Sequence, residues 1–185
     1  WSHVRCRDPE GEPSFGGYRC IRGWDIRQNH DGTPRIATSH MFRFSERFLN
    51  DYLPKTLELG RSFVRLEYQS TRAGVKAIYV LDNLWDGLGA LTVIYPEIEY
   101  LFGKVTMYPS YDEECRNMIL YFLNKHFPDP DKLVTTITPL VTNTDVEAMK
   151  RLFPNDTFKE DYKVLNKAVR EHGYNRPPWV NAYMG

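Results

Sequence analysis

The hydrophobic pattern is clearest over residues 56–81, where a strand-like period is followed by a helix-like one. One face of the predicted strand carries three apolar residues, Leu57, Leu59 and Phe63. The opposite face is predicted to carry Glu58, Gly60, Ser62 and Val64. From Val75 to Tyr95 the apolar positions follow a helical stripe, made of Ile78, Leu81, Leu84, Trp85, Leu88 and Leu91. A polar turn at residues 69–74 separates the two periods, so a strand, a turn and a helix are predicted in succession.

The chain before this segment predicts a hairpin and a short helix. Residues 1–17 combine proline, glycine and charge without periodicity, and they are expected to form a loop or an arm. Residues 18–22 and 35–44 alternate and are predicted to pair as antiparallel strands around a turn at Asp31-Gly32. A short helix is then expected from the capping residue Ser45 to Pro54.

After the predicted long helix, the nearly all-apolar residues 100–107 have the composition of a buried strand in a mixed sheet. Ser110 and Glu113 match a capping box, which predicts that a helix begins there. Residues 133–141 fit either a strand or an extended crossing.

The last part of the chain is predicted to be helical. A helix is expected over 145–153, and a second capping box, Thr157 with Glu160, predicts another. Strands that alternate with crossover helices are typical of a mixed α/β sheet. We therefore predict one α/β domain over residues 1–185, in which 142–185 form a C-terminal helical extension and tail.

Composition narrows the class of protein. The chain has 185 residues, enough for one domain with a substantial core, and 42% of them are hydrophobic. A formal net charge of zero argues against a nucleic-acid binder that works by phosphate neutralisation. The three cysteines show no metal-ligand spacing, and they are expected to be incidental or buried thiols in a reducing compartment. No apolar run approaches the ~18 residues of a membrane span and no signal peptide is evident, which predicts a cytoplasmic protein.

The polar turn has the features of an anion site. A strand followed by a turn and a helix presents backbone N–H groups and a positive helix end to solvent. Arg65, Arg72 and Lys76 lie in or beside the turn and have the charge that a phosphate needs. An ordinary connection between a strand and a helix is the alternative interpretation.

The same turn resembles the acyl-CoA-binding signature of the GNAT acyltransferases, Q/R-x-x-G-x-G/A, with Gln69, Arg72 and Gly74 at the defining positions. Arg72 stands where the first glycine is expected. The segments ELGRSFV, LWDGLGAL and YLFGKVTMYPSY resemble one branch more closely, the ornithine- and glycine-lipid N-acyltransferases that are often labelled hemolysins. The resemblance extends from about Tyr18 to the C-terminus. It implies a GNAT-like mixed sheet in which a splayed central strand is flanked by helices.

The resemblance also implies an acyl donor. Acyl carrier protein is the expected partner, with acyl-CoA as the alternative co-substrate, and neither a permanently bound cofactor nor a metal is expected. The donor's pantetheine arm and phosphate are expected to contact Phe63, Val64, Arg65, Gln69, Arg72, Gly74 and Lys76. In the resembled fold, backbone N–H groups near Phe63 to Arg65 would form an oxyanion hole.

Glu58 is the candidate general base because it is the only carboxylate on the predicted central strand. Partial burial would raise its pKa toward the working range. The alternative is a structural ion pair with Arg61. Simple alternation puts the two side chains on opposite faces, so a direct pair would require a bulge or a twist.

Five residues complete the predicted site. Tyr108 and Tyr111 occupy the region where GNAT enzymes often carry a tyrosine that protonates the leaving thiolate, although a packing or surface role is the alternative for each. Ser39 and His40 are candidates for the acceptor subsite, together with Arg61, which also fits a structural anchor. A histidine on a strand is otherwise often structural.

The function expected from these features is transfer of a fatty or 3-hydroxy-fatty acyl chain to the α-amine of glycine or ornithine, in aminolipid synthesis. Peripheral contact with the inner face of the membrane is a further expectation. One alternative is an acyl-homoserine-lactone synthase, which would need S-adenosylmethionine. Another is a non-catalytic module that binds an acyl group or a carrier protein. Because the chain opens with Trp1, we also expect a fragment or core of a longer protein.

Overall fold

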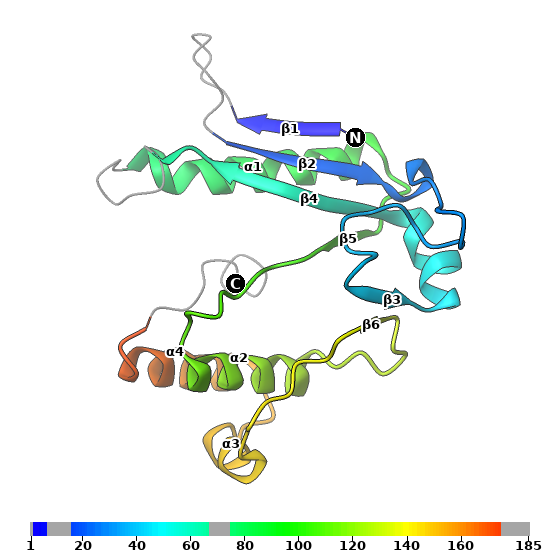
Figure 1. Ribbon diagram of the computed structural model, residues 1–185. Helices are drawn as coiled ribbons and strands as arrows, with labels where there is room; N and C mark the ends of the chain where they lie inside the picture. Colours follow the sequence, from blue (N-terminus) through cyan, green and yellow to red (C-terminus); the bar gives the residue numbers. More distant parts are fainter. Residues whose placement is uncertain (1, 7–15, 67–74, 175–185) are drawn as a thin grey trace. The chain divides into compact units, whose positions relative to one another are not determined.

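The computed structural model describes residues 2–6, 16–66 and 75–174. The chain folds into two compact units. A sheet unit contains the described residues up to Lys104 together with Leu133–Ile137, and a helical unit contains Val105–Lys132 and the described residues from Thr138. The predicted fold class, a GNAT-like mixed α/β sheet flanked by helices with a C-terminal helical extension, is confirmed (Figure 1).

Within the described part of the chain, the main sheet has four strands in the order β1-β2-β4-β5. They are β1 Ser2–Cys6, β2 Gly16–Arg22, β4 Thr56–Val64 and β5 Tyr100–Gly103. β2 is antiparallel to both β1 and β4, whereas β5 runs parallel to β4, which makes the sheet mixed. The prediction of a loop or arm over residues 1–17 is wrong for Ser2–Cys6, because these residues pair with β2 and form the edge of the sheet.

The predicted turn at Asp31-Gly32 forms, with an antiparallel bridge between Gln28 and Pro34, but residues 18–22 and 35–44 do not pair with each other. Residues that follow Ile36 bond to one another in successive turns, with Ser39 N donating to Ile36 O and Phe42 N to Thr38 O. β2 already has β1 and β4 on its two edges, so no edge is left for another strand. Only β3, Phe42–Phe44, is extended here, and it pairs with β6, Val134–Thr136, in a separate two-stranded sheet.

The long helix α1, Val75–Ile94, forms as predicted and covers one face of the main sheet (Figure 1). Its contact with the sheet is a buried apolar cluster that includes Leu84 and Leu88 of the helix and Leu57 and Leu59 of β4. Trp85 and Leu91 pack against the same cluster. Each large side chain buried in this way contributes about 1.5–3 kcal/mol, so the cluster fixes α1 on the sheet.

β5 differs from the predicted buried strand. It is four residues long, and Tyr100 and Leu101 are about two-fifths exposed. Within the described strands β5 pairs on one side only, with the first part of β4. An apolar run therefore became an edge strand, because burial of a strand depends on neighbours that composition does not specify.

The described residues of the helical unit contain three α-helices: α2 Glu113–His126, α3 Val146–Leu152 and α4 Phe158–Glu171. The N-cap of α2 is Asp112, whose Oδ1 accepts from Cys115 N at 2.8 Å, so the predicted cap at Ser110 is wrong by two residues. Thr157 is the N-cap residue of α4 as predicted, but its side chain makes no capping hydrogen bond to the backbone. Its hydroxyl donates to the Glu160 carboxylate at 2.6 Å instead.

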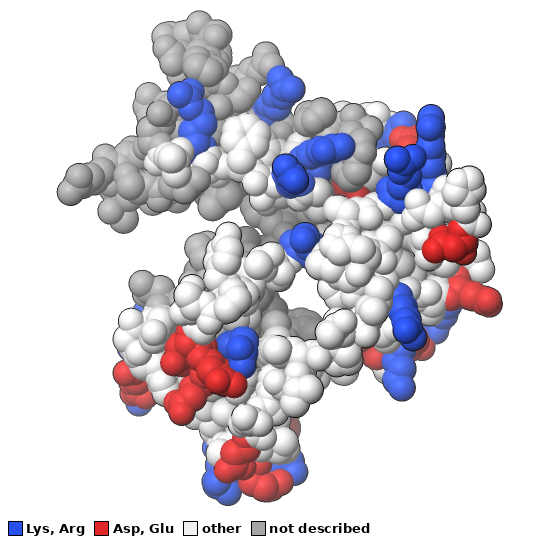
Figure 2. All heavy atoms as spheres, viewed as in Figure 1, with Lys and Arg blue, Asp and Glu red and all other residues white. Residues whose placement is uncertain are grey.

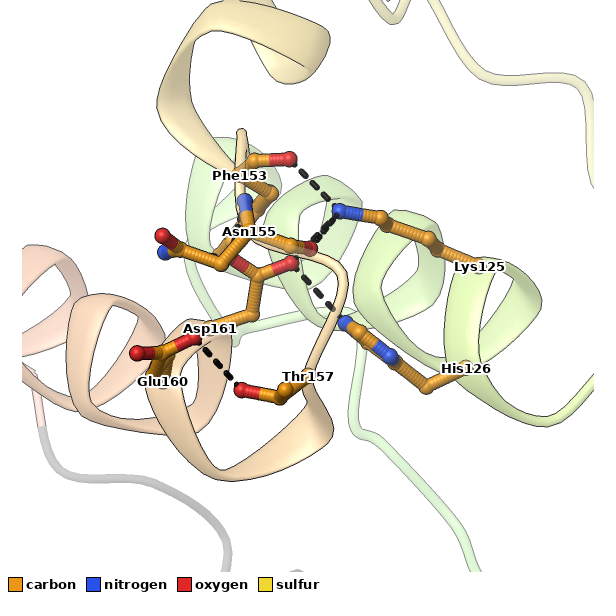
Figure 3. A network of polar contacts seen from close by, with 7 residues as sticks. All are labelled: Lys125, His126, Phe153, Asn155, Thr157, Glu160 and Asp161. Carbon is orange, nitrogen blue, oxygen red and sulfur yellow. Dashed lines mark hydrogen bonds and ion pairs between the residues drawn. The ribbon is translucent and has the colours of Figure 1, made fainter.

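A buried carboxylate fastens α2 to α4 (Figure 3). Asp161 has no exposed surface, and its Oδ2 accepts from Lys125 Nζ at 2.7 Å and contacts His126 Nε2 at 2.9 Å. Its Oδ1 accepts from the backbone and side-chain N–H groups of Asn155. Burial raises the pKa of Asp161, but the hydrogen bonds outweigh burial and hold that pKa below its usual value.

Within the three described ranges, none of the helices has both the length and the apolar content that crossing a bilayer requires.

Candidate functional site

The side chains of the central strand β4 switch to the opposite faces of the sheet at a point in the middle of the strand. Cys20 of β2 is opposite Leu59, but Tyr18 is opposite Ser62, so Gly60 and Arg61 together oppose the single residue Arg19. This two-against-one pairing is a β-bulge. Before the bulge the predicted alternation holds, and after it the alternation is reversed.

The reversal corrects the prediction for the end of the strand. Val64 packs against the apolar cluster under α1, and Ser62 hydrogen-bonds to Tyr18 of that cluster. Phe63, which was predicted to lie on the apolar face, is 53% exposed. The bulge lies between Glu58 and the predicted donor-binding residues Phe63 to Arg65. Bulges next to active sites in other proteins change the direction of side chains in this way.

Glu58 lies on the face of the sheet that α1 does not cover. It is opposite Ile21 on one side and Phe102 on the other, and 1% of its surface is exposed. Its Oε2 has no hydrogen-bond partner. Burial raises the pKa of Glu58, and the charge of Arg19 opposes that rise. A buried carboxylate oxygen without a hydrogen bond is costly, and buried carboxylates with a raised pKa are common at catalytic sites.

Aromatic rings surround the Phe102 side of this face. The Phe102 ring lies 5.4 Å from that of Phe48 and 6.1 Å from that of Phe44, measured between centroids. Phe48 begins a short π-helix, Phe48–Tyr52, and π-helical turns are frequent at functional sites. The aromatic rings lower the local polarity beside Glu58, which disfavours its charged form.

The alternative role for Glu58, an ion pair with Arg61, is not realised in the structure. The bulge that such a pair would require is present, but the two residues form no ion pair. The charge that acts on Glu58 belongs to Arg19 on β2. Sequence reasoning missed Arg19, because only the pairing of β2 with β4 brings it to this face.

Two of the predicted acceptor residues, Ser39 and His40, differ in exposure and in hydrogen bonding. Ser39 Oγ donates to the carbonyl oxygen of Pro34, so this hydroxyl is engaged within its own turn. His40 is exposed. The neighbouring Thr38 is 2% exposed and its Oγ1 has no hydrogen-bond partner, which sequence reasoning did not anticipate.

Most of the predicted donor-binding residues lie in or beside the segment between β4 and α1. Gln69, Arg72 and Gly74 lie outside the described residues. Lys76 lies in the first turn of α1, and Arg65 follows the end of β4 and is half-buried. The pairing of β4 with β5 ends at Leu59 and Gly103, so β4 continues for five residues, to Val64, beyond its last described partner on β5.

Both predicted tyrosines belong to the helical unit, whereas Glu58 belongs to the sheet unit. Tyr108 is 73% exposed. Tyr111 packs against the helical core, with its ring centroid 5.6 Å from that of Tyr174, and burial raises its pKa. Their part in leaving-group protonation stays a prediction.

One group of side chains in the described ranges has the composition of a metal site. Ligand atoms of Asp112, Cys115 and His172 all lie within 4.8 Å of one another. Asp112 is already engaged as the N-cap of α2, and burial together with Asp112 raises the pKa of the Cys115 thiol to about 12. A thiol with this pKa is protonated at neutral pH, whereas metal binding requires the thiolate. The arrangement of Asp112 and Cys115 is therefore explained better by the N-cap of α2 than by a metal site.

Comparison with known proteins gives two close relatives. The chain is 61% identical over 177 residues to a Glycine N(alpha)-acyltransferase of Bacteroides thetaiotaomicron, and 62% identical over 177 residues to one of Phocaeicola vulgatus. Each match covers 96% of this chain but only 52% and 54%, respectively, of the relative. The chain therefore spans about half the length of the curated relatives it matches. No family model and no solved structure matches the chain.

Proposed function

We propose that this chain belongs to an N-acyltransferase that moves an acyl group from a thioester to the α-amine of an amino acid, with glycine as the acceptor. The observation that carries the proposal is the identity of 61% and 62% to two proteins that are both named for this transfer. The buried Glu58 carboxylate supports it from the structure, because acyl transfer to an amine needs a base and Glu58 has the burial of one.

In the proposed reaction the acceptor first loses a proton. The glycine ammonium gives one proton to Glu58, directly or through one water, and becomes a nucleophilic amine. The nitrogen lone pair attacks the thioester carbonyl carbon, forms the C–N bond and places negative charge on the oxygen. As the C–S bond breaks, the nitrogen loses its second proton and the thiolate leaves and is protonated. The products are the N-acyl amino acid, the free thiol and one proton returned to solvent from Glu58.

The remaining roles follow the predicted site. Backbone N–H groups near Phe63 to Arg65 would stabilise the oxyanion, and a tyrosine, Tyr111 or Tyr108, would protonate the thiolate. The end of β4, which continues beyond its pairing with β5, is the part of the sheet that supports an oxyanion role. Ser39, His40 and Arg61 would assist acceptor binding.

For the donor we propose acyl carrier protein, with acyl-CoA as the alternative, and a fatty or 3-hydroxy-fatty acyl chain. The phosphopantetheine phosphate would meet Arg65, Arg72 and Lys76 around the turn before α1. Basic side chains also dominate the charged surface that the sheet unit presents in Figure 2, which suits an acidic carrier protein. The product would be a membrane aminolipid or its precursor, formed at the inner face of the membrane.

Lipid mass spectrometry of cells that express the full-length protein tests the reaction. Wild type is expected to produce a new N-acyl glycine, and Glu58→Gln is expected to abolish it. An equal product from both proteins would retain the enzyme and reject Glu58 as the base. A lactone in place of an N-acyl amino acid, or donor binding without any transfer, would reject the proposed reaction.

Purified protein tests the donor. Arg72→Ala and Lys76→Ala are each expected to raise KM for acyl carrier protein thioester with little change in KM for glycine. Comparison of carrier-protein and CoA thioesters of one acyl chain identifies the preferred donor. Unchanged donor kinetics in both variants would reject the phosphate-binding role of the turn.

A further inference from the structure

Two bulky apolar residues flank Glu58 on the face of the sheet that α1 does not cover. Ile21 of β2 is paired with Glu58 on one side, and Phe102 of β5 is paired with it on the other. Residues paired in this way point to the same face, and their strands lie about 4.8 Å apart. The Glu58 side chain is therefore flanked by an aliphatic side chain and by an aromatic ring.

The Phe102 ring is held in place by two other rings of the sheet unit. Its centroid lies 5.4 Å from that of Phe48 and 6.1 Å from that of Phe44. Phe44 and Phe48 also stack on each other, with 5.2 Å between their centroids. They belong to β3 and to the π-helix, which lie beside β5 in Figure 1. Because packed rings move little, Phe102 forms a fixed wall next to the carboxylate.

Phe102 is also a part of this wall that solvent reaches. Ile21, Phe48 and Glu58 are buried, whereas Phe102 is half-buried. The exposed part of the Phe102 ring is thus a surface that an incoming acceptor meets beside the carboxylate.

A close-packed wall at this position discriminates by size. The Cα of glycine carries two hydrogen atoms, whereas the Cα of every larger α-amino acid carries at least a methyl group. An added carbon in a packed site forces side chains or backbone to move, which is costly. A clash of this kind against the larger competitor is a common source of specificity.

We propose that Phe102 is a specificity-determining residue, whose ring occupies the space that a side chain on the acceptor's Cα would need. The inference rests on the proposed function and gives a reason for glycine as the acceptor. In the proposed reaction Glu58 takes a proton from the acceptor's nitrogen, and Cα is one bond from that nitrogen. The wall therefore acts on the acceptor and leaves the acyl chain of the donor unaffected.

The test measures kcat/KM for glycine and for L-alanine with one acyl donor, in the full-length protein as wild type and as Phe102→Ala. Wild type is expected to prefer glycine, and Phe102→Ala is expected to reduce that preference about tenfold or more, through a rise in the value for alanine. A variant that is only destabilised would lose activity with both acceptors. A gain with alanine therefore reports the shape of the site.

Two further variants complete the comparison. Phe102→Leu keeps an apolar side chain at the position and is expected to give a smaller change in the same direction. Tyr95→Ala is the matched control, because Tyr95 is a half-buried aromatic residue that packs under α1, on the other face of the sheet. It is expected to keep the wild-type preference. Thermal melting shows that each variant is folded at the assay temperature.

An unchanged preference for glycine in both Phe102 variants would overturn the inference. A changed preference for acyl chain length, with the acceptor preference unchanged, would also overturn it, because Phe102 would then line the donor's path.

Calorimetric titration with glycine and with L-alanine separates this inference from the proposed reaction. Consider a protein that transfers no acyl group. If wild type binds glycine alone and Phe102→Ala binds both amino acids, the wall is supported and the acyltransferase is rejected. If Phe102→Ala gains no binding of alanine, the wall is rejected as well.

Discussion

Leu59 and Val64 of β4 pack against the same apolar cluster under α1, although they are five positions apart on one strand. In a regular strand an odd separation puts side chains on opposite faces. The bulge opposite Arg19 adds one residue and brings Val64 back to the helix side. Glu58, which precedes the bulge, stays on the opposite face with Ile21 and Phe102.

Activity is expected to depend on the ionisation of Glu58. Since a general base must be deprotonated, kcat/KM for glycine should fall as the pH drops through the raised pKa of Glu58, above its ordinary value of 4.5. Glu58→Gln should lower kcat by about 10²- to 10⁴-fold and remove the acid limb of the profile. Asp86→Asn, at an exposed position on α1, is the control and should retain the wild-type kcat and the acid limb of the profile. An unchanged acid limb in Glu58→Gln would assign that limb to another group.

The same substitution is expected to stabilise the fold at neutral pH. Because the folded-state pKa of Glu58 is raised, the folded protein binds the proton more tightly than the unfolded chain does. The contribution of Glu58 to stability is therefore fully present below its pKa in the unfolded chain. It is lost as the pH rises through its pKa in the folded protein. Glu58→Gln should gain about 1–3 kcal/mol at pH 7.5, because it removes the charge of a buried group, and the gain should vanish below about pH 4.5, where Glu58 is protonated in both states. Urea unfolding at several pH values measures the difference, and a gain that persists in acid would contradict this account.

In the helical unit, Asp161→Asn is expected to be strongly destabilising. It leaves Lys125 without its buried counterion, and breaking such a pair costs about 3 kcal/mol or more. The pKa of Asp161 is lowered in the fold, so its contribution is present above the unfolded value of 3.8 and is lost as the pH falls through the folded value. Urea unfolding followed by circular dichroism should show a wild-type advantage at pH 7 that shrinks in strong acid. Glu147→Gln, in an exposed pair with Lys150, should behave like wild type, and an equal effect of both substitutions would argue against the role of burial.

Two glycines are expected to respond to alanine in opposite ways. A Cβ at Gly23 would lie 1.5 Å from the backbone oxygen of Leu53, so Gly23→Ala forces backbone to move and should cost more than about 4 kcal/mol. A Cβ at Gly89 of α1 meets nothing within 4 Å, and Gly89→Ala should stabilise the helix by about 1 kcal/mol. Soluble yield and melting temperature of the two variants check this. A Gly23→Ala protein that melts like wild type would mean that the approach of Leu53 is relaxed in solution.

The sequence by itself determined the features that depend on neighbouring residues. Helical periodicity predicted α1 and α4 with nearly correct limits, and alternation predicted the first half of β4. Glu58 could be singled out because it is the only carboxylate on that strand. These signals are local, because the period of a helix or strand is set by the geometry of its own backbone.

The tertiary structure alone decided which strands pair and in what register. Ser2–Cys6 has no periodic signal of its own and becomes a strand only beside β2. The backbone N–H groups of Ser39, Met41 and Phe42 bond within successive turns, and Met41 O accepts from Ile137 N. The bulge at Gly60 and Arg61 exists only relative to β2, and it places Arg19 near Glu58 and turns Phe63 outward. Pairing depends on a partner that is distant in the sequence, and one extra residue in a strand reverses every side chain beyond it. The sequence thus identified the carboxylate, and the fold supplied the charge that acts on it.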